Sequence, residues 1–83
     1  MMTPTFVYVL QSETDPARYY TGRSSNVGER LAAHNGGFSP HTADGRPWRV
    51  IVSIEFREPQ RAIEFEQYLK SGSGRAFAKR HFR

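Results

Sequence analysis

The sequence predicts an α+β domain in which three helices flank a small three-stranded antiparallel sheet, in the order ββαβαα. Three observations lead to this class. Three segments rich in β-branched and aromatic residues have strand length. An amphipathic helical segment follows Pro59, and breaks rich in Gly, Pro or polar residues separate the segments. Because 83 residues leave room for one domain, we expect residues 1–83 to form a single domain.

The first two strands are expected to form a hairpin. Residues 5–12 (TFVYVLQS) suit a strand buried on both faces, and residues 17–24 (ARYYTGRS) suit its partner. The polar turn cluster between them contains Asp and Pro, which favour a chain reversal. If the hairpin is centred on Thr14, Tyr8 and Tyr20 lie directly opposite each other, and their phenols reach a common point.

The next segments predict a helix, a loop and the third strand. Asn26, followed three residues later by Glu29, is typical of a helix cap and predicts a helix over 27–34 that ends at two glycines. The Gly- and Pro-rich stretch 36–47 predicts an exposed loop. Residues 48–57 (WRVIVSIEFR) are the most continuously apolar segment, so they predict a third strand at the centre of the sheet.

Two helices are expected to complete the chain. Pro59 suits the first position of a helix that runs to about Ser71. The Gly72-Ser73-Gly74 stretch is expected to break this helix, and residues 75–82 then form a short final helix.

A carboxylate on the apolar face of the helix after Pro59 is the most informative single residue. At about 100° per residue, Glu66 lies about 40° from Ala62, the centre of the apolar face, whereas Glu64 lies on the opposite, solvated side. A desolvated carboxylate without a partner costs several kcal/mol. Glu66 therefore requires an Arg or Lys, a hydrogen-bond network or a metal cation. Mg²⁺ commonly takes one or two carboxylates plus water and phosphate, so the ion pair and the metal site both stay open.

Composition and charge narrow the class of protein. The absence of cysteine excludes disulfides and thiolate zinc sites. No apolar run reaches the ~20 residues of a membrane span, and residues 1–4 do not resemble a signal peptide, so we expect a cytoplasmic protein without membrane contact. The net charge of +4 indicates a polyanionic partner, most often nucleic acid. From residue 70 onward the chain has no acid and five basic residues: Lys70, Arg75, Lys79, Arg80 and Arg83.

Four sequence landmarks occur in order along these elements. They are Phe6-Val7-Tyr8 on the first strand, Tyr20-Thr21-Gly22 on the second, Arg30 with His34 on one helix face, and Glu66 on the later helix. Their order and spacing resemble the GIY-YIG nuclease superfamily, in particular its small stand-alone members and the N-terminal nuclease module of the excinuclease. The resemblance covers the chain from Thr5 to about Phe82. It departs from the family pattern where Phe6-Val7 replaces Gly-Ile, where Thr21 replaces Ile, and in having no asparagine beyond Asn35.

The resemblance implies roles for the residues around the attacking water. Tyr8 corresponds to the tyrosine that activates the water, and Tyr20 to the tyrosine that positions nucleophile and phosphate. Arg23 corresponds to a basic residue near the nucleophile, and His34 to a supporting residue. Because a free phenol is a poor base at neutral pH, we expect Arg23, Arg30 or His34 to favour the phenolate form of Tyr8.

The resemblance also implies how the phosphate and the DNA are held. Arg30 corresponds to the helix arginine that contacts the scissile phosphate, and Glu66 to the single metal ligand, for Mg²⁺ or Mn²⁺. The basic residues expected to follow the DNA backbone are Arg23, Lys70, Arg75, Lys79 and Arg80.

The function implied is a metal-dependent endonuclease that hydrolyses DNA phosphodiester bonds and takes part in DNA repair. Eighty-three residues expose too little surface to read a long site, so we expect selection by DNA structure, which can be branched, nicked or single-stranded, rather than by sequence. A second copy of the chain or a protein partner would enlarge that surface. The alternative is a catalytically inactive nucleic-acid-binding module of the same fold that recruits a partner. The intact set of Tyr8, Tyr20, Arg30 and Glu66 favours the enzyme.

Overall fold

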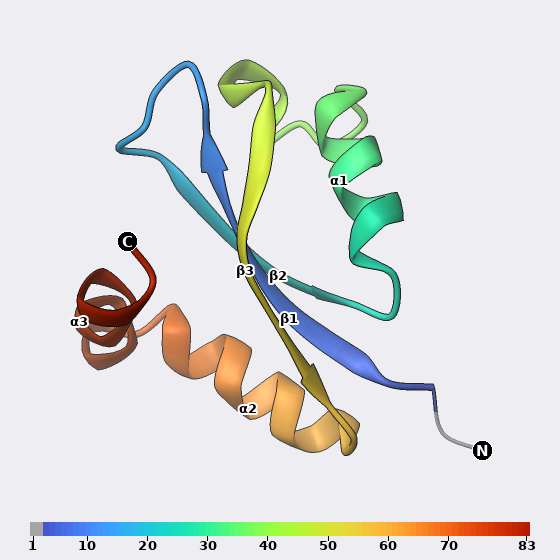
Figure 1. The fold of residues 1–83 in the computed structure, drawn as a ribbon, viewed down its shortest axis with the longest axis vertical. Helices are drawn as coiled ribbons and strands as arrows, with labels where there is room; N and C mark the ends of the chain where they lie inside the picture. Colours follow the sequence, from blue (N-terminus) through green and yellow to red (C-terminus); the bar gives the residue numbers. More distant parts are fainter. Residues whose placement is uncertain (1–2) are drawn as a thin grey trace.

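The computed structural model describes residues 3–83. Its elements follow in the order β1 (Thr5–Ser12), β2 (Tyr19–Ser24), α1 (Val27–Asn35), a short 3₁₀ helix η1 (Ala43–Gly45), β3 (Trp48–Phe56), α2 (Pro59–Leu69) and α3 (Gly72–His81) (Figure 1). This confirms the predicted α+β class and the order ββαβαα. None of the helices in residues 3–83 combines the length and the apolar character needed to cross a lipid bilayer.

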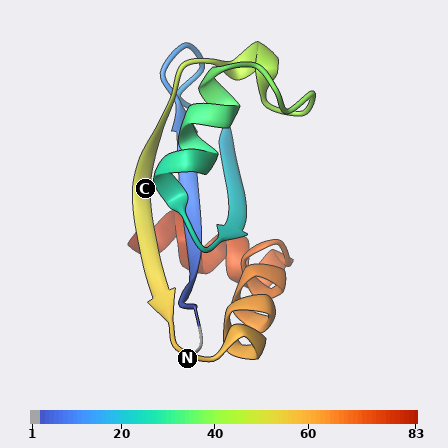
Figure 2. The ribbon, with the colours of Figure 1, turned by 90° about the vertical axis from the view of Figure 1, so that its right-hand side faces the viewer.

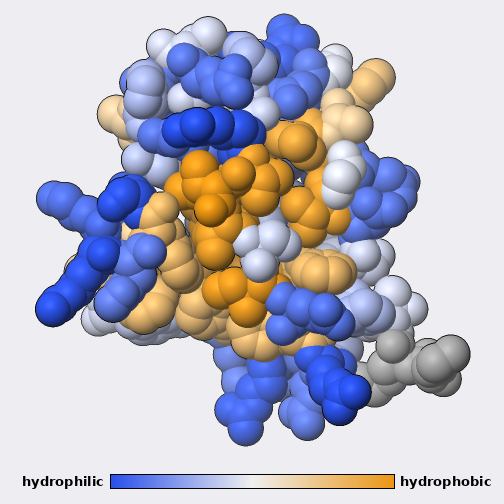
Figure 3. All heavy atoms as spheres, viewed as in Figure 1, coloured by the Kyte–Doolittle hydropathy of each residue, from blue (hydrophilic) through white to orange (hydrophobic). Residues whose placement is uncertain are grey.

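The central strand of the sheet is β1, and the strand order is β2-β1-β3 (Figure 2). The prediction that residues 48–57 form the central strand is therefore wrong. Four consecutive residues of β1, from Val7 to Leu10, are buried, which requires neighbours on both faces. Along β3, by contrast, Ser53 and Glu55 are exposed. Apart from Trp48, which is buried, the apolar residues of this edge strand are half-buried, and apolar side chains gather over β3 in the middle of the face shown in Figure 3.

The register of the β1–β2 hairpin differs from the prediction by two positions. Tyr8 lies opposite Gly22, and Tyr20 lies opposite Leu10. The turn is centred on Asp15 rather than Thr14: the Ser12 N–H donates to the Arg18 carbonyl at 3.0 Å, and the Arg18 N–H donates to the Asp15 carbonyl at 2.9 Å. A shift by two positions leaves every side chain on its original face. The two tyrosines therefore still point to the same side of the sheet, as neighbours on a diagonal.

The sheet separates two layers. Helix α1 covers one face, and α2 and α3 cover the other (Figures 1 and 2). Because successive side chains of a strand point to opposite faces, Tyr8 and Leu10 pack with Trp48 on the α1 side. Val7 and Val9 pack on the other side with the buried residues of the later helices, Ala62, Leu69 and Ala78.

Local sequence explains where the first and last helices begin. The Asn26 side chain accepts from the Glu29 N–H at 3.0 Å and donates to the Glu29 carboxylate at 2.8 Å, so the predicted cap of α1 is confirmed. Helix α3 begins at Gly72, three residues before the prediction, because the Ser71 side chain accepts from the Gly74 N–H at 3.2 Å. A Cβ at Gly74 would overlap the Tyr68 carbonyl, so glycine allows the tight corner between α2 and α3.

The loop between α1 and β3 was predicted to be exposed, but part of it belongs to the core. Thr42 and Gly45 are buried. The Trp48 indole N–H donates to the Thr42 carbonyl at 2.7 Å. The Asn35 side chain accepts from the Trp48 backbone N–H at 2.6 Å and donates to its carbonyl at 3.0 Å, which fixes the end of α1 to the start of β3. These bonds satisfy polar groups that the loop would otherwise bury without partners.

Candidate active site

Three aromatic rings meet between the sheet and α1. Tyr8 comes from β1, Tyr20 from β2 and His34 from the last turn of α1. The ring centroids of Tyr8 and Tyr20 lie 6.4 Å apart, those of Tyr8 and His34 6.3 Å, and those of Tyr20 and His34 4.7 Å. The structure therefore brings together three of the six predicted catalytic residues in one cluster.

A chain of hydrogen bonds runs inward from the Tyr8 phenol. The Tyr8 hydroxyl lies 3.3 Å from Nε2 of His34, and Nδ1 of His34 lies 2.7 Å from Oγ1 of Thr42. All three residues are at most 1% exposed. Oγ1 of Thr42 also donates to the Ser39 carbonyl at 3.4 Å, which leaves the hydroxyl oxygen free to accept from a proton on Nδ1. Sequence reasoning missed Thr42, because it lies in a loop without periodicity that was expected to be exposed.

Gly22 makes room for the Tyr8 phenol. The two residues are partners across β1 and β2. A Cβ built on Gly22 would lie 2.5 Å from the Tyr8 oxygen and 2.7 Å from its Cζ. Only a residue without a side chain lets the phenol lie this close to the backbone of β2. The family resemblance implies a glycine that allows a close backbone approach, and the structure shows that the approaching group is the phenol itself.

Burial is the main cause of the pKa shifts of Tyr8 and His34. It raises the pKa of the Tyr8 hydroxyl above 10.0, although a hydrogen bond from Arg30 acts in the opposite direction. Burial also lowers the pKa of His34 below 6.5, and the positive charge of Arg30 adds to this effect. At neutral pH, therefore, the phenol keeps its proton and the imidazole is neutral. Arg30 favours the phenolate form of Tyr8, as expected, but desolvation outweighs this effect, so the pKa of Tyr8 is raised and not lowered.

Glu66 lies on the other side of the sheet, on α2. Its carboxylate accepts from Nε of Arg23 at 2.8 Å and from Nζ of Lys70 at 3.1 Å. Its side chain is 14% exposed, whereas that of Glu64 is 55% exposed, as the helical spacing predicted. Partial burial alone would raise the pKa of Glu66, but the hydrogen bonds from Arg23 and Lys70 outweigh it and the pKa is lowered. Glu66 is thus ionised at neutral pH and bound to two cations.

The side chains around Glu66 fit a hard cation that has one carboxylate ligand, and they do not form a site with several protein ligands. Within residues 3–83, no group of three or more His, Cys, Asp and Glu side chains could hold a metal ion together. A cation here would therefore have Glu66 as its carboxylate ligand and would complete its shell with water and substrate phosphate, which is common for Mg²⁺. Lys70 has a 55% exposed side chain, so its flexible stem can leave the carboxylate without loss of core packing.

The edge strand β2 joins the two parts of the site. Tyr20 and Gly22 face α1, whereas Arg23 faces α2 and reaches Glu66. The two parts act on each other electrostatically: besides burial, which is the main cause, the negative charge of Glu66 raises the pKa of Tyr8. Arg30 projects from α1 with an exposed side chain beside the Tyr8 hydroxyl. Arg30 and the Tyr8 phenol therefore lie on the α1 side of the sheet, and Arg23 with Glu66 on the α2 side.

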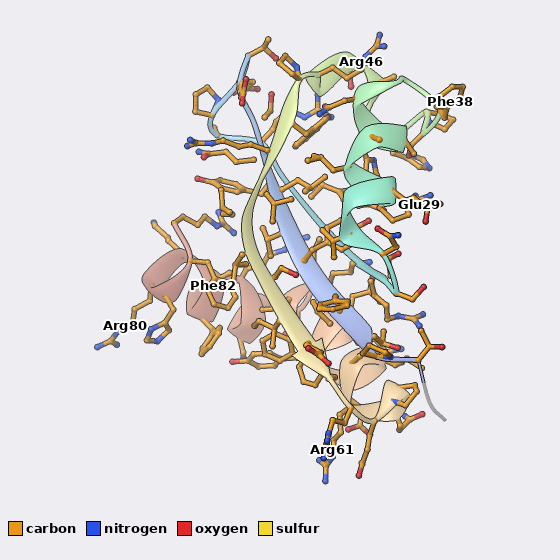
Figure 4. The ribbon with its side chains drawn as sticks, turned by 45° about the vertical axis from the view of Figure 1, so that its right-hand side comes forward. Glu29, Phe38, Arg46, Arg61, Arg80 and Phe82 are labelled. Atoms are coloured by element: carbon orange, nitrogen blue, oxygen red, sulfur yellow. The ribbon has the colours of Figure 1, made fainter. Side chains whose placement is uncertain are left out.

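Apart from Arg23, which binds Glu66, the predicted DNA-binding residues divide into two groups. Lys70 and Arg75 line a hollow of about 370 Å³ beside β2 and Tyr20. Lys79 and Arg80 lie in the exposed last turn of α3. Figure 4 shows Arg80 directed into solvent on the side of the molecule away from α1. The structure thus places the first group next to the cluster and Arg80 away from it.

Comparisons with known proteins agree with this fold. Residues 4–80 match the model of the GIY-YIG catalytic domain. In the solved structure of the UPF0213 protein BH0048 from Bacillus halodurans, 80% of the chain superposes on 92% of this one with a TM-score of 0.55 and 26% identity.

Two proteins named structure-specific endonuclease subunit SLX1 are also similar. The protein from Scheffersomyces stipitis is 34% identical over 74 residues, which cover 78% of this chain and 22% of the relative. The protein from Meyerozyma guilliermondii is 34% identical over 77 residues, which cover 83% of this chain and 26% of the relative. The chain spans about a quarter of the length of these curated relatives. Because the family model matches nearly the whole chain, from residue 4 to residue 80, the chain belongs to the GIY-YIG nuclease family as a catalytic domain.

Proposed function

We propose that this chain hydrolyses DNA phosphodiester bonds as a structure-selective endonuclease with one divalent cation, Mg²⁺ or Mn²⁺. The observation that carries the proposal is the phenol of Tyr8, which is held by a neutral His34 and lies beside the Arg30 guanidinium. This arrangement offers a proton acceptor next to a phosphate-binding charge. Membership of the GIY-YIG family supports the same reaction.

Tyr8 acts as a proton carrier rather than as a preformed phenolate. As the attacking water loses a proton to the Tyr8 oxygen, the phenolic proton passes to Nε2 of His34. The phenol is thus neutral before and after the step, and His34 becomes the imidazolium. A proton on Nδ1, donated to Thr42, keeps Nε2 free to accept. The raised pKa of Tyr8 is then no obstacle, because the tyrosine never holds the charge alone.

Fixed charges around the same edge bind the phosphate. Arg30 presents a planar, permanently charged fork suited to phosphate oxygens. Tyr20 packs against the His34 ring and restrains the Tyr8–His34 pair from the β2 side. Arg23 is held at the site by Glu66, so its positive charge stays near the reacting phosphate. Charge already oriented before the reaction needs no reorganisation during it.

Glu66 is the residue that would hold the divalent cation. When bound, the cation supplies Lewis-acid stabilisation of the departing 3′ oxygen. The half-buried, ionised carboxylate supports this assignment, because it is already deprotonated at neutral pH. The metal ion would then share the Glu66 carboxylate with Arg23 and Lys70. Because Lys70 has the more exposed side chain of these two, we expect it to turn toward the substrate phosphate.

We propose selection by DNA structure because the chain offers a small site at one sheet edge. The similar SLX1 proteins carry the name structure-specific endonuclease subunit, and the word subunit there supports a protein partner or second copy for this chain too. A role in DNA repair accords with this activity. Strong sequence specificity would require more base contacts than this surface provides.

A cleavage panel tests the proposal. Supercoiled plasmid and end-labelled nicked, flapped, single-stranded and branched DNA are incubated with the protein in Mg²⁺, in Mn²⁺ and in EDTA. We expect cleavage of junction-containing DNA that requires a divalent cation. Glu66→Gln should abolish cleavage, whereas the matched variant Glu64→Gln, on the exposed face of the same helix, should cleave like the wild type.

Two results would contradict the proposal. Salt-sensitive DNA binding without cleavage in either metal would identify an inactive nucleic-acid-binding module instead. Cleavage that persists unchanged in Glu66→Gln and in Arg30→Ala would point to a contaminating nuclease.

A further inference from the structure

A hollow of about 370 Å³ lies along the outer edge of β2, where it meets the corner between α2 and α3. The residues that line it include Tyr19, Tyr20 and Thr21 of β2 and the cations Lys70, Arg75 and Arg83. Three of these residues are consecutive in β2. Side chains of consecutive strand residues point to opposite faces, so three in a row can line one hollow only along the backbone edge of the strand. The hollow therefore exposes main-chain groups as well as side chains.

The charge of the hollow is positive. Lys70 lies at the end of α2, Arg75 lies in α3, and Arg83 follows the C-cap of α3. No acidic side chain lines the hollow. The guanidinium of Arg83 lies over the Tyr19 ring, 4.1 Å from its centroid, which holds this charge over the hollow. Three cations of one sign around a cavity favour an anion of corresponding charge.

Backbone N–H and C=O groups of β2 also face the hollow. The Ser12 N–H donates to the Arg18 carbonyl, so the hydrogen-bonded pairs of the β1–β2 ladder continue at Tyr20 and Gly22. The N–H groups of the alternate residues, Tyr19 and Thr21, then point to the outer edge. No strand among residues 3–83 pairs with this edge of β2. Outward N–H groups next to guanidinium groups are suited to phosphate oxygens.

We propose that this hollow binds one unpaired nucleotide of the substrate strand, with its phosphate on Lys70, Arg75 and Arg83. A volume of about 370 Å³ suits a single small ligand, at the lower end of the usual range of roughly 300–1,000 Å³. A nucleotide that is still paired and stacked in a duplex cannot enter a hollow of this size. The occupant must therefore come from a flap, a gap or a strand end.

The hollow shares two residues with the candidate active site. Lys70 lines it and also contacts the Glu66 carboxylate at 3.1 Å. Tyr20 lines it and belongs to the ring cluster with Tyr8 and His34. An unpaired nucleotide in the hollow would thus lie next to the scissile phosphate. The inference rests on the proposed DNA-cleaving function and adds to it the feature of DNA that the enzyme would select, a boundary between paired and unpaired strand.

Binding measurements with two DNA ligands test this inference. Fluorescence anisotropy gives the dissociation constants of the full chain for a labelled flap duplex and for a blunt duplex of equal length, in EDTA to prevent cleavage. We expect the double variant Arg75→Gln/Arg83→Gln to lose about tenfold or more in affinity for the flap and much less for the blunt duplex. For the flap, the slope of log affinity against log salt should become less negative by roughly 1.4, about 0.7 for each lost contact with a single strand.

The double variant Arg57→Gln/Arg61→Gln is the matched control, since it removes two exposed arginines between β3 and the first turn of α2. It should weaken the binding of both DNAs slightly and equally. An equal loss for flap and blunt duplex in Arg75→Gln/Arg83→Gln, or no loss for either, would overturn the inference. So would displacement of the flap by an acidic peptide but not by a short oligonucleotide, which would indicate a protein strand as the occupant.

Binding and cleavage separate this inference from the proposed function. A flap preference that depends on Arg75 and Arg83, in a protein that cuts no DNA, would leave the subsite standing and reject the nuclease proposal. Cleavage of flap and blunt DNA with equal efficiency, together with equal affinities, would support the nuclease proposal and reject the subsite.

Discussion

The hydroxyl of Tyr8 lies 3.3 Å from Nε2 of His34, although 26 positions separate the two residues in the chain. The central strand β1 holds one partner, and the last turn of α1 holds the other. On the far side of the imidazole, Nδ1 lies 2.7 Å from the Thr42 hydroxyl. Because a neutral imidazole carries one proton, a proton on Nδ1 that is donated to Thr42 would leave Nε2 free to accept from Tyr8. Each member of this hydrogen-bond series can be replaced by mutation separately.

Tyr8→Phe removes the proton carrier and keeps the ring. We expect kcat to fall by about 10²–10⁴-fold, which is typical for the loss of a general acid or base, while the affinity for DNA stays within about twofold. Quench-flow cleavage of a labelled flap, together with anisotropy binding, measures both. Tyr68→Phe is the control, since this tyrosine is 40% exposed on α2. A Tyr8→Phe protein that cleaves at the wild-type rate would exclude Tyr8 from the proton path.

Thr42→Val keeps the shape of the side chain and removes the acceptor for Nδ1 of His34. We expect kcat to fall about tenfold and the pH–rate profile to shift, and we expect Thr42→Ser, which restores the hydroxyl, to recover most of the rate. The free energy of unfolding should fall by about 1–3 kcal/mol, because a buried polar group loses its partner.

Nitrogen NMR shifts of His34 make the Thr42 prediction specific. The wild type should carry the imidazole proton on Nδ1, and the Thr42→Val protein should move it toward Nε2. An unchanged tautomer and pH profile, with stability alone reduced, would show that Thr42 has only a structural role.

Gly22→Ala should damage the site from the β2 side. The new Cβ would lie 2.5 Å from the Tyr8 oxygen, so either the phenol or the strand must shift. We expect a loss of about 1–3 kcal/mol in stability from overpacking and a fall of at least tenfold in kcat. At Gly28 a Cβ would make only ordinary contact, 3.5 Å from Asn26, so Gly28→Ala should stabilise α1 by up to about 1 kcal/mol. Denaturant unfolding and initial cleavage rates for both variants test this prediction. Equal stability and equal rates in Gly22→Ala and Gly28→Ala would contradict it.

Stability should depend on pH through His34. Its pKa in the folded protein is lowered below 6.5, so the unfolded chain binds more protons as the pH falls through that value. The free energy of unfolding should therefore decrease from pH 7.5 to pH 5.5. Glu66 does not contribute in this window, because its pKa lies below 4.5 in the folded protein. Urea titrations across the window should show a weaker pH dependence for His34→Gln, and an unchanged dependence would disprove the assignment.

The sequence was sufficient for the features that depend on local pattern. The cap at Asn26, the start of α2 at Pro59 and the inward placement of Glu66 follow from helix geometry and side-chain chemistry, and the structure confirms them. The family was recognisable because Tyr8, Tyr20, Arg30 and Glu66 keep their order and spacing along these elements.

Features that depend on long-range packing could not be read from the sequence. The apolar content of β3 predicts that it is the central strand, but β1 pairs with both other strands and β3 lies at the edge. The hairpin register depends on how the turn closes, and here Ser12 pairs with Arg18 rather than with Pro16, as a turn centred on Thr14 would require. Thr42 carries no periodic signal, and its burial results from the way Trp48 and Asn35 hold the loop against the sheet.

Among residues 3–83, Tyr8 is also the largest of the fully buried side chains. The side chain proposed to move the proton is therefore a principal part of the small core under α1. A region of this kind cannot melt on its own while the remainder stays intact. We expect heat to inactivate the protein at the temperature at which it unfolds, without an earlier inactive state that keeps its overall shape.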